Sequence, residues 1–123
     1  MRRNWIYRRG DIYYADLGVK DGSEQGGKRP VVLIQNNVGN RHSPTLTVVP
    51  VTSHPKKALQ PTHFIFYPQF VLQGPSMVMA EQIMTIDKSK IVSYVGRLNE
   101  EQLNGVMEAV QIHLGLRKSL WME

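Results

Sequence analysis

Arg29 and Thr52 are the residues of this sequence whose types and placement best suit chemistry on a phosphodiester. Arg29 follows a glycine-rich polar loop and precedes residues 30–35, an apolar run that predicts a strand buried on both faces. Thr52 ends a second, β-branched segment at 45–52. If the two strands pair as a hairpin, the start of the first lies opposite the end of the second, which places Arg29 beside Thr52.

An arginine held on a strand suits phosphate chemistry because its guanidinium stays charged and forms forked hydrogen bonds to phosphate oxygens. When the 2′-hydroxyl of RNA attacks the adjacent phosphorus, negative charge builds on the non-bridging oxygens, and a preorganised cation stabilises it. The Thr52 hydroxyl would position a phosphate oxygen, since an unperturbed hydroxyl is a poor base. On pattern alone, the commoner arrangements are a surface arginine paired with Glu24 or Asp21, and a threonine bonded to backbone.

Glu24 and Glu81 are the carboxylates that could act as a base toward a 2′-hydroxyl. Glu24 lies in the polar loop and Glu81 follows a short apolar strand, although a solvated acid is the commoner arrangement. His42 and His63 have no orienting partner in the sequence and receive no role. Three amides suit the base edges of single-stranded RNA and equally suit turns and strand ends: Gln35, Asn36 and Gln82.

Composition places the chain among soluble globular proteins. Its 123 residues predict one domain, 1–123, and the formal charge of +5 favours a polyanionic partner. The absence of cysteine excludes disulfides and thiolate metal sites, and the spacing of the histidines predicts no zinc site. No apolar run reaches the roughly 20 residues of a membrane span, and the N-terminus does not read as a signal peptide, so we expect a cytoplasmic protein without metal or cofactor.

Short strands dominate the pattern up to residue 97, and a helix follows. A strand is predicted at 11–17, a turn at 36–44 with Gly39 and Asn40 as its tight residues, and a helical turn at 85–89. Asn99 and Gln102 form a capping-box pattern at the start of an amphipathic C-terminal helix that ends near Gly115. A small twisted barrel carrying this helix accounts for the order. Further strands are predicted at 62–67, 76–80 and 92–98.

Several segments together resemble the MazF/PemK family of toxin endoribonucleases. The matching segments are RGDIYYADL (9–17), GSEQGGKRP (22–30), IQN (34–36), VPVTS (49–53), PTH (61–63), EQI (81–83) and TID (85–87). The resemblance spans about residues 8 to 115, leaving a basic N-terminal arm at 1–7 and an extension at 116–123. Each element is short, but their order and spacing together are specific.

The resemblance implies a mainly β fold with α: an SH3-like small barrel of the CcdB/MazF type with a C-terminal helix, found as a homodimer. It implies metal-independent, sequence-specific cleavage of single-stranded mRNA to 2′,3′-cyclic phosphate and 5′-hydroxyl ends, and an antitoxin with an acidic, partly disordered segment. The family's catalytic arginine and threonine fall on Arg29 and Thr52. Its RNA-binding positions fall on Ser23, Glu24, Gln25, Lys28, Asn36, Ser53, Glu81 and Gln82.

Two alternatives remain open at this point: a gyrase-inhibiting toxin of the same fold, and a non-catalytic SH3-like binding module. One departure also bears on function, because Met84 stands where many relatives carry an arginine after Glu-Gln-Ile. The loss of that cation would weaken a phosphate contact or shift it to Arg41, Lys56 or Lys57.

Overall fold

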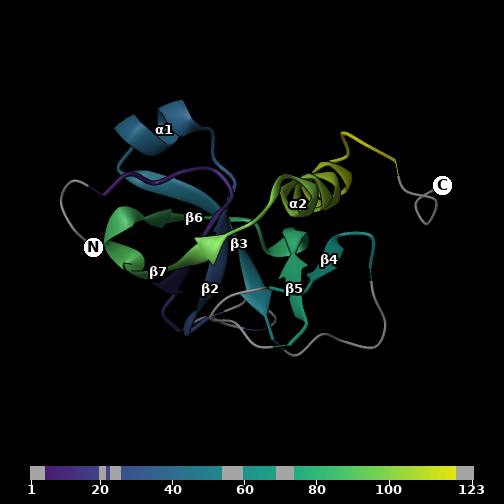
Figure 1. Cartoon of the computed structure of the whole chain (residues 1–123), viewed down its shortest axis with the longest axis horizontal. Helices are drawn as coiled ribbons and strands as arrows, with labels where there is room; N and C mark the ends of the chain where they lie inside the picture. The colour runs from purple at the N-terminus through teal and green to yellow at the C-terminus, as the bar shows by residue number, and fades with distance from the viewer. Residues whose placement is uncertain (1–4, 20–21, 23–25, 54–59, 69–73, 119–123) are drawn as a thin grey trace.

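The fold is a curved antiparallel sheet with one long helix near the C-terminal end of the chain (Figure 1). The computed structural model describes residues 5–19, 22, 26–53, 60–68 and 74–118. Predicted contacts Ser23, Glu24 and Gln25, and the lysines at 56 and 57, lie outside these ranges. The elements are β1 (Asp11–Asp16), β2 (Lys28–Leu33), α1 (Asn37–His42), β3 (Thr45–Thr52), β4 (His63–Phe66), β5 (Ser76–Met79), η1 (Ala80–Gln82), β6 (Met84–Asp87), η2 (Lys88–Lys90), β7 (Ile91–Arg97) and α2 (Glu100–His113).

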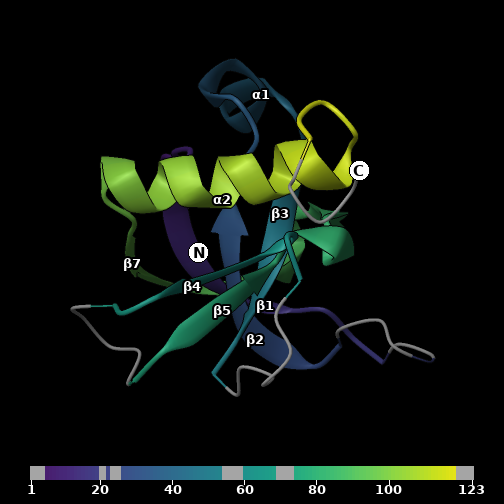
Figure 2. The same ribbon diagram turned by 90° about the vertical axis from the view of Figure 1, so that its right-hand side faces the viewer.

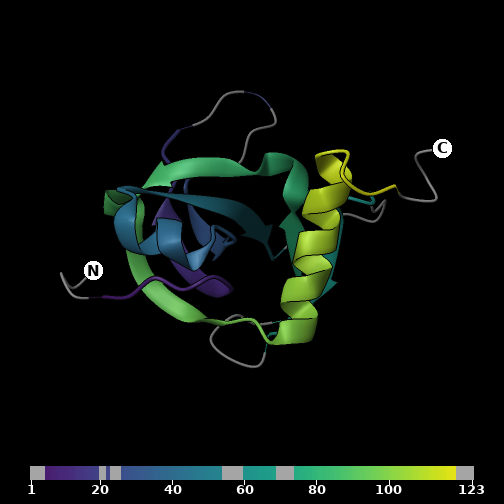
Figure 3. The ribbon, with the colours of Figure 1, turned by 90° about the horizontal axis from the view of Figure 1, so that it is seen from above.

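Strand β3 organises the sheet because it changes partner along its length. The strand order is β4-β5-β3-β2-β1-β7, with β6 paired to the first half of β3 and β5 paired to its end. Viewed from above, the strands curl into a ring, and α2 lies along one side of it (Figure 3). This arrangement confirms the predicted small barrel with a C-terminal helix.

Strand β2 is buried on both faces, as its apolar run predicts. Val32 packs in one core cluster, with α2 residues that include Val106 and Val110. Val31 and Leu33 pack in a second cluster on the other face, around Tyr13 and Leu46. The chain therefore has an apolar layer on each side of β2, which holds the strand that carries Arg29 in a fixed position.

The capping box at the start of α2 is confirmed. The backbone N–H of Gln102 donates to Asn99 Oδ1 at 2.7 Å, and the backbone N–H of Asn99 donates to Gln102 Oε1 at 3.0 Å. Gly115 follows the helix with a φ of 75°, the left-handed conformation expected of a residue that ends a helix. Within the described residues, no helix is long and apolar enough to cross a membrane.

Two local predictions are wrong. Residues 36–44 form the short helix α1 instead of a tight turn, because the Asn36 side chain accepts the Gly39 N–H at 2.8 Å and caps the helix, while Asn40 is buried beneath it. The helical turn predicted at 85–89 is mostly strand β6, which pairs with Thr45–Val48 of β3, and only its end enters the 3₁₀ turn η2.

Candidate functional site

Arg29 and Thr52 lie level with each other on adjacent antiparallel strands. The pairing of β2 with β3 matches Val31 with Pro50 and Val32 with Val49. Continuing this register by two residues places Arg29 of β2 opposite Thr52 of β3, and both residues lie within their strands. Directly opposed residues have Cβ atoms roughly 5 Å apart, so their side chains can reach one ligand.

The two side chains also share a face of the sheet. Side chains alternate along a strand, so Arg29 lies on the face of Val31 and Leu33, and Thr52 lies on the face of Val48. Val31, Leu33 and Val48 all belong to the second core cluster. Arg29 and Thr52 therefore stand at the end of one apolar face, where the cluster gives way to polar side chains.

The backbone of the preceding turn holds the Arg29 guanidinium. Its Nε donates to the carbonyl oxygen of Gly26 at 2.9 Å, and the side chain is partly buried. The two terminal amino groups carry the remaining donors, which are the ones that form a fork to a phosphate. Lys28, the exposed first residue of β2, adds a second cation nearby and pairs across the sheet with Asp16.

Glu81 lies on η1 and is held by two residues at the start of β4. Thr62 Oγ1 donates to Glu81 Oε1 at 2.9 Å, and His63 Nε2 lies 2.9 Å from Oε2. The Gln60 N–H donates to His63 Nδ1 at 3.4 Å, so the Nε2 position carries the proton and donates to Glu81. The sequence leaves His63 without a partner, and the structure gives it one.

The Glu81 carboxyl is more acidic than an ordinary glutamate. Burial, the largest single influence, acts to raise its pKa. The hydrogen bonds from His63, from its own backbone N–H and from Thr62 outweigh that effect together, and the pKa of Glu81 lies below its usual value. Glu81 is therefore an ionised, hydrogen-bonded anchor at neutral pH, with both oxygens engaged, and is poorly suited to act as a base.

The other predicted contacts lie at different places in the fold. Ser53 directly follows Thr52, and Gln82 lies next to Glu81 on η1. Asn36 lies beyond the far end of β2, where it caps α1, and the structure does not bring it to Arg29. Among the described residues, no group of three or more His, Cys, Asp or Glu side chains could hold a metal ion.

Solved structures with the same fold define the class of this protein. The chain matches a mycobacterial endoribonuclease solved in complex with its cognate antitoxin, with a TM-score of 0.76 and 28% identity over 92% of this chain and 99% of that one. It also matches MazF from Deinococcus radiodurans, with a TM-score of 0.79 over 91% of this chain and 99% of that one; at 21% identity, this second match shows the fold alone.

The family model for the PemK-like, MazF-like toxin of type II toxin-antitoxin systems matches residues 8–114. The chain belongs to this family, as the motifs predict. It is 46% identical to endoribonuclease EndoA of Bacillus subtilis, over 90% of this chain and 97% of that protein. It is 44% identical to endoribonuclease MazF of Staphylococcus saprophyticus, over 90% of this chain and 93% of that protein.

Proposed function

We propose that this chain is an endoribonuclease toxin that cleaves single-stranded RNA, chiefly mRNA, by attack of a 2′-hydroxyl on the adjacent phosphorus. The products carry 2′,3′-cyclic phosphate and 5′-hydroxyl ends, and the reaction uses no metal. The proposal is supported by membership of a family of such toxins and by the register of β2 and β3, which, continued by two residues, brings Arg29 opposite Thr52.

In this proposal Arg29 stabilises charge on the scissile phosphate, and Thr52 orients it. The bond from Arg29 Nε to Gly26 fixes the guanidinium before substrate arrives, so little reorganisation is needed as charge develops. Lys28, Ser53 and Gln82 contact the RNA strand. Glu81 has both oxygens committed, so it acts by holding η1 in place for Gln82.

We further propose that residues 1–123 act as one toxin domain in the cytoplasm, as a homodimer neutralised by a cognate antitoxin. The relative with a mycobacterial source was solved with its cognate antitoxin, which supports this partner. The formal charge of +5 suits both an RNA substrate and an acidic antitoxin segment. Loop residues Ser23, Glu24 and Gln25, together with Asn36, complete the set of proposed RNA contacts.

The test is cleavage of a long single-stranded RNA in EDTA by the wild type, Arg29→Ala and Thr52→Ala. Loss of a charge-stabilising group costs about 10²–10³ in rate, which is the effect we expect for Arg29→Ala. Loss of the Thr52 hydroxyl removes one hydrogen bond to a charged group and should cost roughly 10- to 100-fold. Mapping both ends of each product identifies the cyclic phosphate and the recognised sequence.

Arg117→Ala is the matched control, because it removes the same charge from an exposed side chain whose ion pair to Glu108 spans 3.7 Å. It should cleave like the wild type. Full activity of a folded Arg29→Ala variant would refute the proposed site. RNA left intact by the wild type, with DNA breaks that depend on gyrase, would instead support the gyrase-inhibiting alternative.

A further inference from the structure

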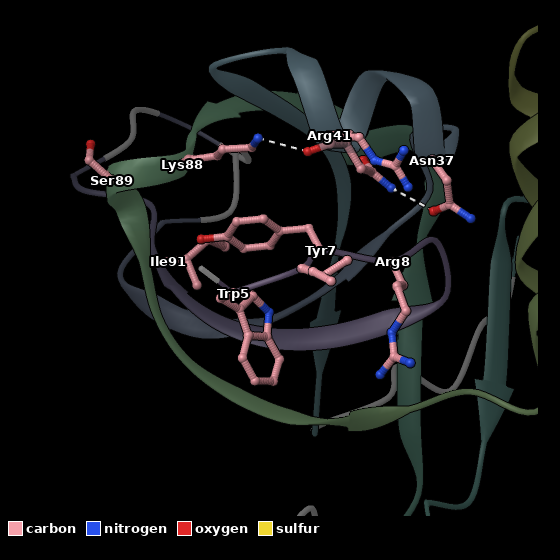
Figure 4. Close-up of a pocket in the computed structure, with 10 residues that line it drawn as sticks. Trp5, Tyr7, Arg8, Asn37, Arg41, Lys88, Ser89 and Ile91 are labelled. Atoms are coloured by element: carbon pink, nitrogen blue, oxygen red, sulfur yellow. Dashed lines mark hydrogen bonds between the residues drawn. The ribbon is translucent and has the colours of Figure 1, made fainter. Parts of the chain in front are cut away.

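A second concave site lies at the other end of β2 from Arg29. It is a cavity of about 640 Å³ between the N-terminal segment 5–8, α1 and the turn that leads into β7 (Figure 4). Figure 2 shows β2 pointing toward α1, with the start of the strand at the far end. Five steps along a strand span roughly 17 Å. A ligand in this cavity therefore does not contact the Arg29 guanidinium.

The cavity is positively charged. Arg8, Arg41 and Lys88 line it, and no carboxylate belongs to the residues that line it. The Arg8 charge is partly balanced by Asp11, whose Oδ2 lies 3.8 Å from Arg8 Nε. Arg41 is exposed and has no ion pair with any residue that the structure describes. At least two cations of this wall are thus available to an anion.

Lys88 is fixed in place before any ligand binds. Its Nζ donates to the backbone carbonyl oxygen of Asn40 at 2.7 Å and lies 5.3 Å from the centre of the Tyr7 ring (Figure 4). An ammonium group has three donors, so two stay available for a phosphate. Burial raises the pKa of the Tyr7 hydroxyl, which keeps this wall free of negative charge.

Asn40 is buried beneath the cavity and holds α1 in place. It is 1% exposed, and its Nδ2 donates to the Gln35 carbonyl at 2.9 Å and to Asn37 Oδ1 at 3.1 Å. Asn37 Oδ1 itself accepts the Arg9 N–H, so these bonds fix which way the Asn40 amide points. The remaining oxygen, Oδ1, is buried without a donor among the described residues. A buried acceptor without a donor is rare in folded proteins, and this oxygen is shut off from the cavity, so the Asn40 side chain fixes α1 rather than contacting a ligand.

The third component is aromatic. Trp5 lines the cavity with its indole held by a bond from Nε1 to the Tyr13 hydroxyl at 3.1 Å and by ring contact with Tyr94 at 5.2 Å. Figure 4 shows the Trp5 and Tyr7 rings on the same side of the cavity, across from Arg41. A flat ring of a ligand could lie against the Trp5 indole, a contact that suits any nucleobase.

We propose that this cavity binds a nucleotide. Arg41 and Lys88 hold its phosphate, and Trp5 contacts its base. A bare phosphate would use the cations alone and would leave the aromatic wall unused. The ligand is either a free nucleotide or one nucleotide of an RNA strand held far from the scissile bond.

The test is calorimetric titration of the full chain with 5′-AMP, inorganic phosphate and adenosine. AMP should bind at least about tenfold more tightly than either of the other two, since each supplies only part of the contacts. Arg41→Ala and Lys88→Gln should each weaken AMP binding about tenfold, the usual loss for a charge-assisted bond. Arg117→Ala removes an equal charge from a distant part of the surface and should leave AMP binding unchanged.

The chain has two tryptophans, Trp5 and Trp121, so a Trp121→Phe variant assigns the indole N–H resonance of Trp5. That resonance should shift on addition of AMP. AMP binding should also survive Arg29→Ala, which separates this site from the proposed catalytic one. If Lys88→Gln fails to fold, AMP binding by the Arg41→Ala variant, whose substituted side chain is exposed, is sufficient to test the proposal.

Four results would overturn the proposal: no AMP binding, phosphate binding as tight as AMP, AMP binding insensitive to Arg41→Ala, or AMP binding lost in Arg29→Ala. An uncleavable oligoribonucleotide added to the Arg29→Ala variant identifies the source of the nucleotide. Competition with AMP that also needs Arg41 supports a strand, and absence of competition supports a free nucleotide.

Discussion

Replacement of Glu81 tests whether this residue is the buried anchor that the contacts indicate. The His63 side chain is 2% exposed and the Glu81 side chain 28% exposed, and their nitrogen and oxygen lie 2.9 Å apart. In Glu81→Gln, the amide oxygen can still accept from His63, and the amide nitrogen can donate to the Thr62 hydroxyl. Two hydrogen bonds thus survive and only the charge is lost.

The hydrogen bonds that each variant keeps or loses determine the expected change in the free energy of unfolding. A hydrogen bond to a charged group contributes about 1.5–3 kcal/mol and a neutral one about 0.5–1.5 kcal/mol, so Glu81→Gln should cost about 1 kcal/mol. Glu81→Ala leaves the buried His63 N–H without an acceptor and should cost about 3 kcal/mol. Glu108→Gln, at a surface ion pair spanning 3.7 Å, should cost less than about 1 kcal/mol.

The effect of charge has a defined pH dependence. Because the folded-state pKa of Glu81 lies below its ordinary value of 4.5, folding releases a proton there, and the stabilisation is fully present above pH 4.5. It is lost as the pH falls through the folded-state pKa. The difference in stability between wild type and Glu81→Gln should therefore stay constant toward neutral pH and shrink in acid.

Urea unfolding followed by circular dichroism, at neutral pH and below pH 4.5, measures all three variants. Two results would refute the reasoning. One is a cost for Glu81→Ala no larger than that for Glu108→Gln, and the other is a Glu81→Gln difference that grows as the pH falls.

Two further substitutions test packing and substrate contact. Gly105→Ala should lower the free energy of unfolding by about 1–2 kcal/mol in a thermal scan, because a Cβ at this position overlaps the Phe64 ring. This strain exceeds the gain of about 1 kcal/mol in helix propensity. A more stable variant would contradict the close packing of α2 on β4. Met84→Arg places a cation next to Val48 of β3. If this cation contacts a phosphate, the plot of the logarithm of the binding constant for uncleavable RNA against the logarithm of salt concentration should steepen by about 0.7. An unchanged slope would show that residue 84 does not contact the RNA.

Local pattern carried most of the fold prediction. Periodicity located six of the seven described strands to within about two residues and missed β6. The β2–β3 hairpin followed from two apolar segments that are adjacent in sequence. The capping box of α2 was predictable because Asn99 and Gln102 are three residues apart and interact with each other's backbone. In each case the determining contacts lie within a short stretch of chain.

The features that sequence did not predict depend on distant partners. Helix α1 has only six residues, and Lys88, 48 residues away in the sequence, donates to the carbonyl oxygen of its Asn40. His63 and Glu81 are 18 residues apart and meet only because β4 pairs with β5, which sets His63 opposite Met79. The nucleotide site joins three segments, represented by Trp5, Arg41 and Lys88, that nothing in the sequence connects.

The RGD segment at 9–11 shows what a family motif can encode besides chemistry. Arg9 Nε donates to the carbonyl oxygen of Ile34, and the Gly10 N–H donates to that of Leu33 at 2.8 Å. Gly10 has a φ of 94°, a conformation that side chains disfavour. Asp11 is fully buried and accepts from Arg97 at 2.8 Å. The motif ties the start of β1 to the ends of β2 and β7.

The contrast with Arg29 gives a physical criterion for separating structural motifs from chemical ones. The Asp11 carboxylate receives donors on both oxygens, from Arg97 on one and from the Tyr13 hydroxyl at 2.7 Å on the other, so the fold accounts for it fully. Among the described residues, Arg29 is bound through its Nε, which donates to Gly26. Its terminal amino groups, which carry the forked recognition of phosphate, are not needed for that bond. The fold therefore explains the charge of Asp11. It does not explain the terminal amino groups of Arg29, which makes Arg29 the residue of this pair with a chemical role.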